Sequence, residues 1–169
     1  GDVNYAYIRS NRIENNLGDG ISIHDGSNYN IHGNLLFNNS GYGVNITDST
    51  DCKVNSNTFI NNNGATDIFS TSRIQAYTTH SSNLWDESGY GNYWNDWTGP
   101  DADNDGIVDE PYLIFGSSIF DNKPLTEPSY MYLSEPLNFT LDTGRDQVTL
   151  NWMEPEFDLD GSLSGYEVH

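Results

Sequence analysis

The sequence has few of the residues that mark several large classes of protein. Its 169 residues include one cysteine, Cys52, so no internal disulfide can form. Only 6 Lys and Arg stand against 25 Asp and Glu, which gives a formal net charge of −19. Such a field repels nucleic-acid backbones and anionic membrane surfaces, so cations are the expected partners and nucleic acids are not. No run of 18 apolar residues is present, and we therefore expect no direct membrane insertion through a helix.

Asparagine and glycine are abundant instead, and both are poor helix formers and good turn formers. Aromatic residues make up 13% of the chain, which is too much for a sequence unable to bury a core. The composition therefore predicts a folded, turn-rich, all-β, acidic protein.

The first third of the chain repeats every 23 residues. Segments 11–16, 34–39 and 57–62 read NRIENN, NLLFNN and NTFINN, and GISI at 20–23 is repeated as GVNI at 43–46. Within each copy, apolar and polar residues alternate with the period of two that is typical of strands. Clusters of Asn, Gly and Ser separate these short strands and indicate turns.

One such unit cannot bury its apolar face alone, but stacked units pair their equivalent strands in parallel. The repeat therefore predicts a parallel β-helix. Two inward apolar rows would be Ile8, Ile31, Val54 and Ile13, Leu36, Phe59. Stacked asparagines at 11, 34 and 57 would satisfy one another by hydrogen bonds, and we interpret them as structural.

The repeat fades after residue 63. Residues 64–69 and 73–77 still have the pattern of strands, and then the composition changes abruptly at Trp85. An aromatic-rich segment that follows a solenoid is expected to close its open end. We interpret the rings as packed core, with a sugar-stacking platform as the alternative; they are Trp85, Tyr90, Tyr93, Trp94, Trp97 and Tyr112.

Residues 101–109, DADNDGIVD, carry the sharpest chemical signal. Asp101, Asp103 and Asp105 occupy relative positions 1, 3 and 5, and glycine at position 6 permits a tight turn. Position 7, Ile107, offers its backbone carbonyl, and Asp109 at position 9 adds a carboxylate directly or through water. Hard oxygen ligands on a flexible loop favour Ca²⁺. Position 12 is tyrosine rather than the glutamate of an EF-hand, so this is an EF-like calcium loop outside an EF-hand.

The segment GYGNYWNDWTGPDADNDGIVDEPYLI (89–114), with DNKPL (121–125), resembles the C-terminal signature of NosD-like parallel β-helix proteins. The resemblance covers roughly residues 1–125. It implies a right-handed β-helix of the carbohydrate-binding and sugar-hydrolase type, in a secreted or cell-surface protein of archaea or bacteria. The founding member is associated with copper delivery, a role that the few scattered Met, Cys and His residues here do not favour.

The last segment, residues 134–169, resembles the start of a fibronectin type III domain. It reads SEPLNFTLDTGRDQVTLNWMEPEFDLDGSLSGYEVH. Strands are expected at 137–141, 147–152 and 164–168, with Trp152 in the core and Tyr166 on the third strand. These three cannot close a seven-strand sandwich, so we expect a fragment, with more coils before Gly1. The predicted organisation is coils at 1–84, an aromatic and calcium-loop cap at 85–125, a linker at 126–136 and an incomplete fibronectin-like domain at 137–169.

These features favour a calcium-binding, extracellular or cell-surface module with a structural, adhesive or carbohydrate-binding role. Its expected partners are glycans or neighbouring surface-protein subunits, with self-assembly as one form of contact. Three sequons, at Asn38, Asn45 and Asn138, are compatible with a glycosylated surface.

A carbohydrate-active enzyme is the alternative, and copper delivery is a second one. Asp25 and Asp48 lie 23 residues apart and would be stacked neighbours, with His24 beside Asp25. Two carboxylates can act as an acid/base pair in a lyase or glycoside hydrolase. The simpler interpretation, that both are exposed turn residues, favours no catalytic role for this segment.

Overall fold

A computed structural model describes residues 6–87, 89–116, 118–129, 137–143 and 148–153. The chain divides into two units, Gly1–Tyr130 and Met131–His169, and each is described by itself. Among the described residues, no helix is long and apolar enough to cross a membrane.

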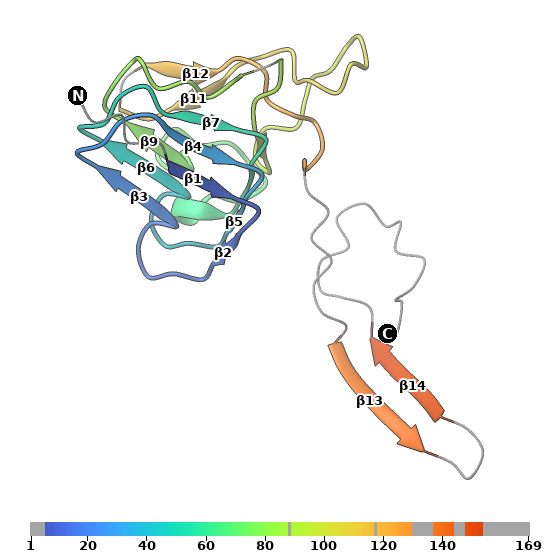
Figure 1. The fold of residues 1–169 in the computed structure, drawn as a ribbon. Coiled ribbons are helices and arrows are strands. Elements are labelled where there is room, and N and C mark those ends of the chain that lie inside the picture. The colour runs from blue at the N-terminus through green and yellow to red at the C-terminus, as the bar shows by residue number, and fades with distance from the viewer. Residues whose placement is uncertain (1–5, 88, 117, 130–136, 144–147, 154–169) are drawn as a thin grey trace. The chain divides into compact units, whose positions relative to one another are not determined.

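The first unit is a coil of short strands that stack into three parallel sheets (Figure 1). The first sheet holds β1 (Ala6–Arg9), β4 (Tyr29–His32) and β7 (Lys53–Asn55); the second holds β2 (Arg12–Glu14), β5 (Leu35–Phe37), β8 (Thr58–Ile60) and β10 (Tyr93–Trp94); the third holds β3 (Ile21–His24), β6 (Val44–Thr47) and β9 (Ala76–Thr78). Each turn of the coil adds one strand to each sheet, which is the architecture of a parallel β-helix.

The pairing register confirms the 23-residue repeat. Ile8 pairs with Ile31 and Ile31 with Val54 in the first sheet. Ile13, Leu36 and Phe59 pair in the same way in the second sheet, and Ile21 with Val44 in the third. Most of these side chains point inward and are fully buried. The alternation of apolar and polar residues therefore fixed both which face of each strand lies inside and which strands meet.

The stacked asparagines form a continuous hydrogen-bonded ladder. The backbone N–H and the side-chain amide of Asn11 donate to Oδ1 of Asn34, those of Asn34 to Oδ1 of Asn57, and those of Asn57 to Oδ1 of Asn92. Asn92 in turn donates to Oδ2 of Asp121. The ladder supplies partners to polar groups that would otherwise be buried unpaired at the turns.

A second ladder runs parallel to the first. The backbone and side-chain amides of Asn16 donate to Asn39, those of Asn39 to Asn62, and those of Asn62 to Oε1 of Gln75. The Gln75 amide then donates to Oδ1 of Asp96 at 2.8 Å. Both ladders therefore end on a buried carboxylate, which only accepts hydrogen bonds in its charged form.

The prediction of a strand at residues 64–69 is wrong. The chain there forms a short 3₁₀ turn, η1 (Asn62–Gly64), followed by irregular backbone, and Ile68 is exposed. Asn63 and Gly64, where the strand should begin, have positive φ angles of 53° and 66°, which are incompatible with an extended strand. The expected strand at 73–77 forms as β9, shifted toward its C-terminal end.

The closing segment, residues 85–125, continues the core of the coil with aromatic rings. Trp94 pairs with Phe59 in register and stacks on it at a centroid separation of 4.1 Å, and Tyr112 stacks on the other side of Trp94 at 4.0 Å. Trp85, Trp94 and Tyr112 are almost completely buried. These three rings are therefore packed core, whereas Tyr90 is the exposed member of the set.

The end of the first unit contains a pair of antiparallel strands. Strands β11 (Tyr112–Ile114) and β12 (Ile119–Asp121) pair antiparallel, unlike every strand of the coil. In the second unit, β13 (Leu137–Thr143) and β14 (Val148–Met153) also pair antiparallel. The third strand expected there, at residues 164–168, lies outside the described residues.

Candidate functional site

The Asp-rich loop brings three of its carboxylates together. Oxygen atoms of Asp101, Asp103 and Asp105 lie within 4.8 Å of one another, and all three side chains are at least partly exposed. Gly106 has a φ of 84° with open space around it, so the backbone angle, rather than crowding, requires glycine. The turn at Gly106 is what allows positions 1, 3 and 5 to face one point.

Backbone N–H groups inside the loop already hold these carboxylates in place. Oδ2 of Asp101 accepts from the N–H of Gly106 at 3.1 Å, and Oδ1 of Asp105 accepts from the N–H of Ile107 at 2.8 Å. The N–H of Asp105 donates to Oδ1 of both Asp101 and Asp103. Each carboxylate is thus oriented by the chain before any ion enters.

The remaining two predicted ligands are placed differently. Oδ2 of Asp109 accepts from the N–H of Ala102 at 2.9 Å, so this carboxylate closes the loop, and it is not part of the group of three. Ile107 pairs with Leu125 through a bridge whose hydrogen bonds use the N–H of Val108 and the carbonyl of Gly106. That pairing does not use the carbonyl of Ile107.

The loop is tied to the end of the coil. The N–H of Val108 donates to the carbonyl of Pro124 at 2.7 Å, and the N–H of Leu125 donates to the carbonyl of Asn92 at 2.9 Å. Asn92 belongs to the first asparagine ladder. Order in the loop is therefore coupled to order at the end of the coil through hydrogen bonds to a shared segment.

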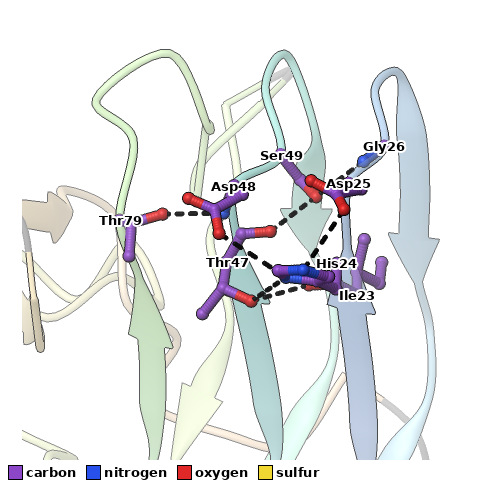
Figure 2. A network of polar contacts seen from close by, with 8 residues as sticks. All are labelled: Ile23, His24, Asp25, Gly26, Thr47, Asp48, Ser49 and Thr79. Atoms are coloured by element: carbon purple, nitrogen blue, oxygen red, sulfur yellow. Dashed lines mark hydrogen bonds and ion pairs between the residues drawn. The ribbon is translucent and has the colours of Figure 1, made fainter.

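A second cluster lies where β3 and β6 end (Figure 2). Nε2 of His24 lies 3.3 Å from Oδ2 of Asp25, and Nδ1 lies 3.6 Å from Oδ2 of Asp48. Oγ1 of Thr47 lies 3.0 Å from the same Nδ1. The structure thus brings the proposed acid/base pair of Asp25 and Asp48 together, with the imidazole between them.

The surroundings of this pair give little support to acid/base catalysis. The side chains of Asp25 and Asp48 are 78% and 63% exposed, and they sit on the outer corner of the coil. A general acid at neutral pH needs a desolvated carboxyl group, as in glycoside hydrolases. Neither Asp25 nor Asp48 has that desolvated setting, because both side chains are open to solvent.

Two buried acids were not singled out from the sequence. Burial raises the pKa of Asp121 to about 7, although four N–H donors from Asn92, Trp94 and Lys123 favour its charged form. Burial also raises the pKa of Asp96, against the hydrogen bond from Gln75. Each of these acids accepts the last hydrogen bond of one ladder. In the sequence, their position inside the aromatic-rich segment was the only indication that they are buried.

The outer face of the first sheet is hollowed. A cavity of about 100 Å³ opens beside the exposed ring of Tyr7, and its wall combines aromatic, amide and charged groups. The side-chain oxygen of Asn30 is buried there, and it has no hydrogen-bond partner among the described residues. The residues around this hollow are Tyr7, Asn28, Tyr29, Asn30, Asp51 and Lys53.

The three sequons differ in access. Asn38 is exposed at a turn, although its amide donates to Asn15. Asn45 lies within β6 and is half-buried, with its amide donating to Asp19 at 2.7 Å, so it is less accessible to a glycan than Asn38. The side chain of Asn138 lies outside the described residues.

Comparison with known proteins gives one family. The family described as "Right handed beta helix region" matches residues 2–96, which is more than half of the chain. Neither the curated proteins nor the solved structures contain a match to this sequence.

Proposed function

Because the chain belongs to the right-handed β-helix family, we propose that its first unit is a calcium-stabilised module of an extracellular or cell-surface protein. The observation that carries the proposal is the convergence of Asp101, Asp103 and Asp105 on one point. Three like charges at this separation repel one another, and a divalent cation turns that repulsion into attraction. The ion would be structural, because its loop is tied to the end of the coil.

The chemistry of the donor set fits Ca²⁺. The loop offers carboxylate oxygens at positions 1, 3 and 5 and a backbone carbonyl at position 7, the pattern of oxygen-rich calcium loops. Asp109 would support the ion through water, because its Oδ2 already accepts from Ala102. We extend the family assignment to the NosD-like type on the motif around this loop, and to a fibronectin type III-like second unit on the antiparallel pairing of β13 with β14.

Calcium binding is tested by calorimetry and thermal melting of the full 169-residue chain, with and without a chelator. A ligand that binds only the folded state stabilises it by about 2.7 kcal/mol at 100 times its Kd, so chelation should lower the Tm. Asp103→Asn and Asp105→Asn should abolish that dependence. Asp51→Asn, which removes one exposed charge elsewhere, is the matched control. Equal melting of the wild type with and without calcium would exclude the proposal.

As the partner of this module we propose a glycan, bound at the hollow beside β1, β4 and β7. The exposed Tyr7 ring can pack against the face of a sugar, and the amide and charged side chains that line the hollow can hydrogen-bond to sugar hydroxyls. A glycan array probed with the calcium-loaded chain tests this, with Tyr7→Ala as the binding variant and Tyr90→Ala as the control. Loss of signal in both variants, or in neither, would contradict a site at the hollow.

If the array shows no binding, contact with neighbouring protein subunits remains the other proposed role. Sedimentation of the full chain over a range of concentrations then tests self-assembly directly.

A further inference from the structure

We propose that His24, Asp25 and Asp48 form a second metal site, selective for a divalent transition metal such as Zn²⁺. The three side chains place one nitrogen and two oxygens within 4.8 Å of one another. This site is separate from the calcium loop in sequence and in ligand type, and it goes beyond the proposed function.

The geometry of His24 fits a metal ligand. Two ligands about 2.0–2.1 Å from a tetrahedral zinc ion lie roughly 3.3 Å apart. Nε2 of His24 and Oδ2 of Asp25 are separated by 3.3 Å. Oδ2 of Asp48 lies 3.6 Å from the other ring nitrogen, Nδ1, so Asp48 supplies a third ligand by turning its exposed side chain toward Nε2. Water completes the coordination, as at zinc sites with three protein ligands.

The opposite ring nitrogen has the partner that a metal-binding histidine needs. Nδ1 of His24 lies 3.0 Å from Oγ1 of Thr47, on the neighbouring strand (Figure 2). With the metal on Nε2, the Nδ1–H donates to that hydroxyl, which fixes the tautomer and the orientation of the ring. The hydroxyl itself is held by the coil, because Thr47 pairs in register with His24.

The stacking of the coil supplies an independent reason for a cation at this corner. His24 and Thr47 are the last pair of the β3–β6 register, so Asp25 and Asp48 follow at equivalent positions of successive coils. Two like charges stacked in register destabilise a sheet unless they are neutralised. A dication between them balances both carboxylates, whereas an imidazole carries at most one positive charge for the two.

The ligand set also separates this site from the calcium loop. Imidazole nitrogen suits zinc, copper and nickel, whereas calcium and magnesium prefer sets made of oxygen alone. We therefore expect zinc to bind at His24 in the presence of saturating calcium.

The experiment is a Zn²⁺ titration of the full chain by calorimetry, with excess Ca²⁺ to occupy the aspartate loop. The wild type should bind one equivalent of zinc. His24→Gln should lose that equivalent, and Asp48→Asn should weaken it at least tenfold. His80→Gln, which alters an exposed histidine outside the cluster, and Asp105→Asn, which alters only the calcium loop, should leave it unchanged.

Unchanged circular dichroism and melting of His24→Gln in calcium would show that the variant is folded. If the wild type binds no zinc equivalent under these conditions, or if His24→Gln binds as the wild type does, the site does not exist. Because the calcium loop is tested by other variants, failure of this proposal leaves that of the calcium site standing, and the reverse also holds.

Discussion

The coils and the closing segment build the same ladder at different spacings. Within the coils, Asn34 accepts from Asn11 and donates to Asn57, and both steps span 23 residues. In the closing segment, the step from Asn57 to Asn92 spans 35 residues and the step from Asn92 to Asp121 spans 29. The extra residues between successive ladder positions in the closing segment lie outside the ladder. The hydrogen bonds therefore continue after the 23-residue repeat has ended.

The apolar rows show the same contrast. In the coils, one inward row consists of Ile13, Leu36 and Phe59, and the closing segment extends it with the rings of Trp94 and Tyr112, which stack in turn on Phe59. Larger side chains are needed there because the end of the row must be covered as well as filled. The comparison indicates that the coils are held by contacts that repeat every 23 residues. The closing segment is held by large aromatic rings that extend the apolar row and by polar side chains that complete the hydrogen-bonded ladders.

The largest expected effect is the loss of stability when a packed side chain is removed, compared between the closing segment and a coil. Trp94→Ala removes the middle ring of the stack and should lower the free energy of unfolding by about 3–5 kcal/mol. Leu36→Ala, at the equivalent position of a coil, should cost about 2–5 kcal/mol. Urea unfolding of both variants measures the difference. A cost below about 1 kcal/mol for Trp94→Ala would mean that the stack does not hold the end closed.

The next effect concerns Asp121, the acid that ends the first asparagine ladder. Its pKa is about 7 in the folded protein and near 4 in an unfolded chain, so the folded state binds the proton more tightly. The stability that this group contributes is therefore full below about pH 4 and is lost as the pH rises through 7. Between pH 5 and 8 the wild type should lose about 2–3 kcal/mol from Asp121, from the linkage of protons to unfolding.

Asp121→Asn tests this, because asparagine does not titrate. The difference in unfolding free energy between wild type and variant should change with pH in the stated direction. Asp51→Asn serves as the exposed control. A difference that stays constant from pH 5 to 8 would show that Asp121 does not titrate in this range.

A matched pair of asparagines tests whether the ladder is one structure. Asn57→Ala and Asn92→Ala each leave two buried donors of the preceding asparagine without an acceptor, so each should cost about 1–3 kcal/mol. Asn55→Ala, whose side chain lies outside both ladders, should cost less. Chemical denaturation of the three variants measures this. A much smaller cost at Asn92 than at Asn57 would mean that the ladder weakens in the closing segment.

The smallest effect is expected where the two regions meet at the surface. Lys53, in a coil strand, pairs with Glu87, in the turn that precedes β10. The two side chains are 43% and 30% exposed, so water and salt screen the pair and its coupling should be under about 1 kcal/mol. A double-mutant cycle with Lys53→Met and Glu87→Gln measures it. A coupling of several kcal/mol would show that this contact, rather than the ring stack, joins the regions.

The candidate sites could be predicted only in part from the sequence. Asp101, Asp103 and Asp105 were predicted from spacing, because a loop of nine residues brings its own side chains together. The proximity of Asp25 to Asp48 followed from the 23-residue repeat. The place of His24 between them, with Thr47 behind its ring, was not predictable, because it depends on side-chain directions across two coils.

The sequence alone determined the coil, since a repeat of fixed length with alternating apolar residues has one arrangement that buries every copy. It also determined that rings would gather at the end of that coil. The tertiary structure decided which residues complete the ladders, because Gln75, Asp96, Asn92 and Asp121 lie at irregular spacings and are recognisable only by the donors that they meet. The physical reason is that a hydrogen bond depends on where two groups lie in space. In the closing segment, insertions of different lengths mean that neighbours in space no longer have a fixed separation in the sequence.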